Sequence, residues 1–96
     1  MAQSTRRAPE RELIESQHEF PGEYLIKAFG PASATFREGA VAAARGAVGD
    51  RVSVSERLSS KGNSVCVTLV LQAQTVDEVI ATYERLHELS ELKLIL

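Results

Sequence analysis

The sequence predicts an α+β fold in which four strands and two helices follow one another in the order β-α-β-β-α-β. Two observations lead to this prediction. Four segments alternate apolar and polar residues with the period of two that is typical of strands, and two other segments repeat apolar residues at helical spacing. The chain of 96 residues is long enough for one domain of this kind and too short for two.

In the first half of the chain, residues 23–29 form the first predicted strand, and Gly30-Pro31 is expected to end it. Ser33 is a suitable N-cap for a helix that runs to about residue 48, where Gly49 suits the position after the last turn. Small side chains on one stripe of this helix predict that it packs closely on a sheet. The stripe consists of Phe36, Ala40, Ala43 and Ala47.

In the second half, residues 51–58 and 64–73 alternate as strands, and the polar residues 59–63 between them predict a hairpin turn. Thr75 and Glu78 have the spacing of a capping box at the start of a second helix, which ends near residue 89. Residues 92–96 form a last short strand. Its inward-facing residues are expected to be Leu92, Leu94 and Leu96.

This element order has one favoured arrangement. Right-handed crossovers place both helices on the same face of the sheet. The result is a ferredoxin-like two-layer sandwich with an antiparallel four-stranded sheet of order 4-1-3-2. Residues 20–96 form this domain, and the polar residues 1–19 are expected to be a mobile arm with a helical turn near residues 10–17.

Composition excludes several classes of protein. The formal charge of −2 does not favour nucleic acid or an anionic membrane as a partner. Cys66 is the only cysteine, so the chain has no internal disulfide. No apolar run is long enough for a secretory signal or a transmembrane helix. We therefore expect a cytoplasmic protein with no membrane partner.

Several short motifs resemble one known family over residues 20–96. They are Phe20-Pro21, Ile26-Lys27 followed by Gly30, the turn at residues 59–63, and the final residues 93–96. In this order and spacing they resemble the YbeD-like family of small uncharacterised bacterial proteins. The resemblance implies a ferredoxin-like fold similar to the ACT regulatory domains, and no established activity. ACT domains usually carry an acidic or amide side chain in the loop after the first strand, which Phe29-Gly30-Pro31 lacks.

Two loops are candidate anion sites. Free backbone N–H groups at the start of the first helix, and successive N–H groups in the hairpin turn, are both suited to holding an anion. The simpler alternatives are an ordinary strand-to-helix turn and a solvated hairpin in which Gly62 or Asn63 adopts a positive φ. The candidate contacts are Lys27, Gly30, Ser33, Ser59, Ser60, Lys61, Gly62 and Asn63.

The sheet face without helices is a candidate interface. Four apolar residues are expected on it, together with the positive charges of Lys27, Arg57 and Lys93. The four are Leu25, Phe29, Val70 and Ile95. A contiguous apolar surface usually has a partner, whereas scattered apolar residues on a surface are normal, and both interpretations stay open here.

These observations favour a non-enzymatic regulatory or protein-interaction module. We expect it to form a homodimer or to bind another, unidentified protein. The alternative is an ACT-like sensor that binds a small anionic metabolite through Lys27 and Lys61. RNA binding is less favoured, because Phe29 is the one aromatic residue expected on the open face. His18 and His87 have no metal-ligand spacing and Cys66 has no evident base, so we expect no catalysis, metal or cofactor.

Overall fold

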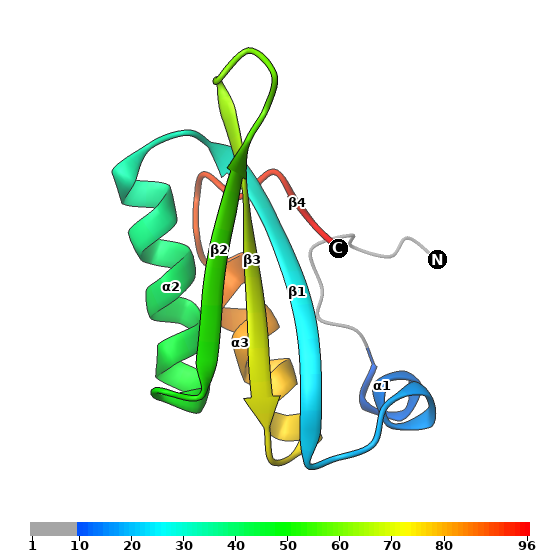
Figure 1. The fold of residues 1–96 in the computed structure, drawn as a ribbon. Helices are drawn as coiled ribbons and strands as arrows, with labels where there is room; N and C mark the ends of the chain where they lie inside the picture. The colour runs from blue at the N-terminus through cyan, green and yellow to red at the C-terminus, as the bar shows by residue number, and fades with distance from the viewer. Residues whose placement is uncertain (1–9) are drawn as a thin grey trace.

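The computed structural model describes residues 10–96 (Figure 1). From β1 onward the elements follow the predicted order β-α-β-β-α-β, but the prediction of two helices is wrong, because a third helix precedes β1. None of the helices in the described part of the chain is long and apolar enough to cross a membrane. The elements are α1 (Arg11–Gln17), β1 (Gly22–Pro31), α2 (Ala34–Val48), β2 (Val52–Leu58), β3 (Ser64–Ala73), α3 (Val76–His87) and β4 (Leu94–Ile95).

The four strands form one antiparallel sheet in the order β2-β3-β1-β4. Counted from the β4 edge, this is β4-β1-β3-β2. Helices α2 and α3 pack side by side against one face of the sheet, and the other face carries no helix (Figure 1). We call this second face the open face. The β2–β3 hairpin extends beyond the ends of β1 and β4 (Figure 1).

The hydrophobic core lies between the sheet and the two helices. Even-numbered residues of β1 and odd-numbered residues of β3 point into it, because residues that oppose each other in an antiparallel pair share a face. The hydroxyl groups of Tyr24 and Tyr83 lie 3.1 Å apart inside this core and satisfy each other. The largest fully buried side chains are Phe36, Ile26, Leu69, Leu71, Leu86, Val65, Val67, Val79 and Thr82.

Helix α2 begins as the sequence predicts. Ser33 is its N-cap, and the Ser33 hydroxyl accepts a hydrogen bond from the Phe36 backbone N–H at 3.1 Å. Gly49 follows the helix with a φ of 65°. Gly39 lies where an added Cβ would be 2.8 Å from the Leu89 side chain. The absence of a side chain at this position therefore allows α3 and the residues after it to pack closely on α2.

Helix α1 lies in the segment that was expected to be a mobile arm. Ile14 is 2% exposed and belongs to the hydrophobic core, and α1 packs against α3. Arg11 also forms an ion pair with Asp77 in the first turn of α3. The expectation of a mobile arm over residues 10–19 is therefore corrected. The same expectation for residues 1–9 concerns residues outside the described part of the chain.

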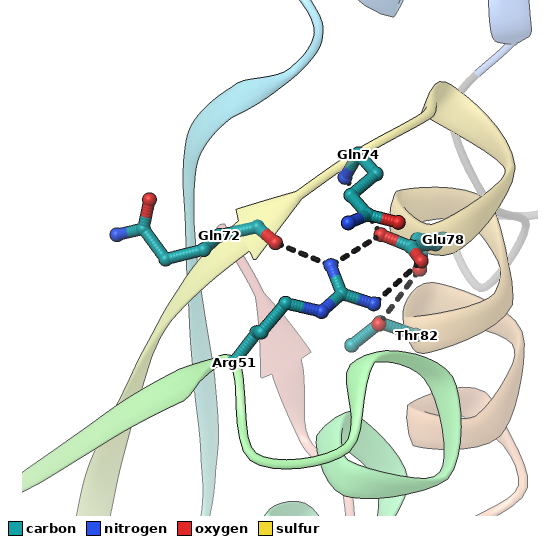
Figure 2. A network of polar contacts seen from close by, with 5 residues as sticks. All are labelled: Arg51, Gln72, Gln74, Glu78 and Thr82. Atoms are coloured by element: carbon teal, nitrogen blue, oxygen red, sulfur yellow. Dashed lines mark hydrogen bonds and ion pairs between the residues drawn. The ribbon is translucent and has the colours of Figure 1, made fainter.

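A polar network joins the start of β2 to the start of α3 (Figure 2). Arg51 donates two hydrogen bonds to the Glu78 carboxylate, at 3.0 and 2.7 Å, and a third to the Gln72 carbonyl at 2.6 Å. Glu78 also accepts the Gln74 backbone N–H at 2.7 Å. The predicted capping box is therefore wrong in part, because the Thr75 hydroxyl makes no cap hydrogen bond and Glu78 reaches Gln74.

We expect Glu78→Gln to lower the free energy of unfolding at neutral pH by about 1 kcal/mol, because a neutral amide bonds Arg51 more weakly than a carboxylate does. Hydrogen bonds from Arg51 lower the pKa of Glu78 from its usual 4.5, partial burial opposes this, and the Gln74 N–H adds to the lowering. A lowered pKa contributes stability above pH 4.5 that is lost as the pH falls through the folded-state value.

Urea unfolding of the wild type and of Glu78→Gln between neutral and acidic pH measures this contribution. The difference in stability between the two proteins should shrink below pH 4.5, where the wild-type carboxylate becomes protonated. Glu84→Gln is the matched control, because Glu84 is an exposed residue of the same helix. A difference that stays constant across the pH range would contradict this role of Glu78.

Two strand predictions are also corrected. Strand β1 does not end before Gly30 but continues to Pro31, which pairs with Ser64. A proline is tolerated there because Ala32 donates to the Asn63 carbonyl at 3.1 Å, so position 31 is not required to donate a hydrogen bond to β3. In the last strand, Leu92 is buried, but Leu94 and Leu96 are exposed. A turn precedes β4, so the alternation that starts at Leu92 does not continue into the strand.

Candidate functional site

The open face carries an apolar cluster over β1, β3 and β4. Leu25 opposes Val70 in the β1–β3 pair, and Phe29 opposes Leu94 in the β1–β4 pair. Leu96 exchanges backbone hydrogen bonds of 2.8 and 3.0 Å with Lys27, which places its side chain on the same face. We call these apolar residues the open-face patch: Leu25, Phe29, Val70, Leu94 and Leu96.

The three leucines of the open-face patch are exposed to solvent. Leu25 and Leu94 are each 51% exposed and Leu96 is 64% exposed. Phe29 and Val70 are half-buried. Lys27 is the one charged residue among them. The register thus places apolar residues of three strands on one face, with Lys27 between the Leu25–Val70 pair and the Phe29–Leu94 pair.

The prediction that Ile95 lies on the open face is wrong. Ile95 opposes Ala28, a fully buried residue of the helix-covered face, and packs against the hydrophobic core. In the last strand, Ile95 faces the helices and Leu94 faces the open side, which is the reverse of the expected alternation. Leu94 therefore takes the position in the patch that was assigned to Ile95.

A pocket of about 430 Å³ lies next to the open-face patch, toward the hairpin turn. The sheet register aligns Phe29 of β1, Cys66 of β3 and Arg57 of β2 in one row across the open face. These residues line the pocket together with the base of the hairpin. The hairpin residues that line it are Leu58, Ser59, Ser60, Ser64 and Val65. We call this cavity the hairpin pocket.

The polar groups of the hairpin pocket are a guanidinium group, three hydroxyls and a thiol. The Ser59 hydroxyl accepts the Ser64 backbone N–H at 3.2 Å, and the Cys66 sulfur lies 3.9 Å from the Thr68 hydroxyl. Within residues 10–96, the ion-paired arginines are Arg11, Arg37 and Arg51, and Arg57 is not among them. Arg57 is thus the charged group available to a molecule in this pocket.

A comparison with protein families identifies the chain. The family described as a protein of unknown function, DUF493, matches residues 15–96. The chain belongs to this family. The match confirms the resemblance to the YbeD family, and it includes all of the open-face patch and the hairpin pocket. A comparison with curated proteins gives no match.

The structure does not bring the eight candidate anion contacts of this DUF493 protein together. Ser59 and Ser60 line the hairpin pocket, whereas Lys61, Gly62 and Asn63 form the exposed tip of the turn. The N–H groups of Ser59, Gly62 and Ser64 make hydrogen bonds within the hairpin itself. Gly62 has a φ of 75°, as expected for the glycine of this turn.

The other three candidate contacts lie elsewhere. Gly30 is buried, and an added Cβ there would be 2.6 Å from the ring of Phe36, so Gly30 packs against α2. Ser33 is occupied as the cap of α2. Lys27 lies on the open face and does not line the hairpin pocket.

Sequence reasoning missed Arg57, Ser64 and Cys66 as neighbours in one pocket. The alternation placed Arg57 on the open face but did not bring it to the same row as Cys66. That information lies in the strand register, in which Phe29 opposes Cys66 and Cys66 opposes Arg57. Within residues 10–96, no three His, Cys, Asp or Glu side chains are grouped to hold a metal ion.

Proposed function

We propose that this protein is a cytoplasmic, non-enzymatic regulatory or protein-interaction module that associates with a second copy of itself through the open-face patch. The observation that carries the proposal is the exposure of half or more of Leu25, Leu94 and Leu96 on one face of the sheet. Burying these side chains against a partner would remove apolar surface from water, which is the main driving force for protein association.

A second copy fits this surface because a two-fold contact brings the same patch together from both chains. The open-face patch is apolar, so it can pack against itself without leaving buried charges. Lys27 is the exception, and its long side chain can keep the ammonium group at the rim while its methylene groups cover apolar surface. Helices α2 and α3 pack on the opposite face of the sheet and support its strands (Figure 1).

The combined substitution Leu25→Asp and Leu94→Asp tests the proposal. Two carboxylates in the patch should abolish self-association, because an unpaired charge in an apolar interface is strongly unfavourable. Light scattering should give twice the 10.5 kDa chain mass for the wild type at high concentration, and the mass of a single chain for the variant. Circular dichroism should show that both proteins are folded.

A matched control is the combined substitution Leu13→Asp and Leu58→Asp. These leucines are 53% and 52% exposed, but they lie on α1 and at the end of β2, away from the open-face patch. The control has the same change in charge and should still associate. Dissociation of the control, with an unchanged mass for the open-face variant, would place the interface at α1 or at the end of β2 and contradict the proposal.

A sensor of a small anionic metabolite is the second candidate function, as the ferredoxin-like and ACT-like interpretation suggests. The hairpin pocket is the observation that favours it, because it combines Arg57 with hydroxyl groups and an apolar floor. RNA binding has no comparable support. Phe29 is the only aromatic residue on the open face within residues 10–96, and RNA-binding sheets of this kind stack bases on two or three.

A further inference from the structure

We infer that the hairpin pocket binds a small carboxylic acid with an apolar body, and that Arg57 pairs with its carboxylate. This inference deepens the second candidate function and names the chemical class of its ligand. It does not depend on self-association, because Leu25 and Leu94 of the open-face patch do not line the pocket. Phe29 is the residue that the two sites share.

The size and construction of the pocket suit a small molecule. Its volume of about 430 Å³ lies within the range of roughly 300–1,000 Å³ that is usual for ligand pockets. Its floor is set by strand register and not by a loop, since Phe29, Cys66 and Arg57 lie in one row across three paired strands. The Ser59 N–H donates to the Ser64 carbonyl at 2.9 Å, which fixes the hairpin side of the pocket.

The charge of the pocket favours a carboxylate. A guanidinium group presents a planar pair of N–H donors that matches the two oxygens of a carboxylate. Within residues 10–96, Arg11, Arg37 and Arg51 form ion pairs with acidic side chains, and Arg57 forms none. The one positive charge lining the pocket balances a single negative charge better than the two of a phosphate monoester.

The remaining lining accounts for the apolar body of the ligand. The Phe29 ring and the Cys66 side chain lie in the same row as Arg57, so an apolar group extending from the carboxylate would rest on them. Ser59, Ser60 and Ser64 line the same pocket, and their hydroxyls can donate further hydrogen bonds to the carboxylate. The arrangement thus separates a polar end on β2 from an apolar end on β1.

A titration of the full chain with 3-phenylpropionate, followed by amide NMR spectra, tests the inference. Saturable shifts are expected at Phe29, Arg57, Ser59, Ser60 and Cys66. The neutral amide 3-phenylpropanamide has the same body without the charge and should bind at least about tenfold more weakly, as expected when a charge-assisted hydrogen-bonded pair is lost. Phenyl phosphate should bind more weakly than the carboxylate.

Arg57→Gln should weaken binding of 3-phenylpropionate by about tenfold or more. Lys61→Gln is the matched control, because it removes the same charge from the hairpin tip without altering the pocket lining, and it should leave the affinity nearly unchanged. Cys66→Leu should also weaken binding by filling the floor. The inference is overturned if the pocket residues show no shifts up to the solubility of the acid, or if the amide binds as tightly as the acid. Equal losses of affinity in Arg57→Gln and Lys61→Gln would also overturn it.

The same titration in the Leu25→Asp and Leu94→Asp variant separates this inference from the proposed self-association. Binding that persists in the variant supports the pocket whatever the wild-type mass is. A wild type that associates as proposed but shows no saturable shifts at the pocket refutes the ligand inference alone.

Discussion

Phe36→Ala is expected to lower the free energy of unfolding by about 3–5 kcal/mol, the usual cost of removing a buried aromatic ring. Phe36 is 1% exposed and lies in the first turn of α2, where its ring covers Gly30 of β1. The substitution therefore removes the contact that joins the start of α2 to the end of β1. Urea denaturation at neutral pH measures the loss.

Gly30→Ala tests the same contact from the other side. Its methyl group would lie 2.6 Å from ring carbons of Phe36, so the ring must move, at a cost of about 1–3 kcal/mol. The double variant should be less destabilised than the sum of the two single variants, because the alanine at position 36 leaves room for the new methyl group. Additive losses would show that the two residues do not share this contact.

Ile14→Ala is expected to lower the free energy of unfolding by about 2–4 kcal/mol, because it leaves a cavity between α1 and the core. Ile14 is the one buried residue of α1, so the helix should also detach when this side chain is removed. Urea denaturation measures the stability, and amide hydrogen exchange over residues 11–17 reports the detachment.

Leu13→Ala provides the control for this prediction. Leu13 is the neighbouring residue of the same helix and is 53% exposed, so its truncation should change the stability by no more than about 0.5 kcal/mol. Equal effects of the two substitutions would mean that α1 contributes through its helical content and not through docking of Ile14.

Much of the fold follows from local sequence patterns. Strong alternation in residues 64–73 predicts β3 with its buried face, because period two leaves only one way to bury four apolar residues in a strand. Ser33 predicts the start of α2 for a similarly local reason, since its hydroxyl needs only the N–H of a residue three positions later.

The errors arise where distant residues decide the structure. Helix α1 is too short to be stable alone and depends on burial of Ile14 in the core. Glu78 departs from the capping box because Arg51 holds its carboxylate. The phase of β4 is set by pairing with Ala28 and Phe29, since two residues are too few to show an alternation of their own.

The candidate site also combines features that local patterns predict with features that distant residues determine. Alternation alone predicts that Leu25, Phe29 and Val70 share the open face. The hairpin pocket depends on the registers of two strand pairs, which align Arg57 with Cys66 and Cys66 with Phe29. A pattern within one strand does not contain that alignment, so the role of Arg57 as the charged group of a pocket emerges only from the structure.

The most direct test of self-association through the open-face patch is an isotope-filtered NOE experiment on a mixture of labelled and unlabelled chains. It detects only contacts between different copies of the protein. Self-association through the open-face patch predicts intermolecular NOEs between the methyl groups of Leu25, Val70 and Leu94. Intermolecular NOEs confined to Val54 and Leu58 of β2, or none at high protein concentration, would contradict it.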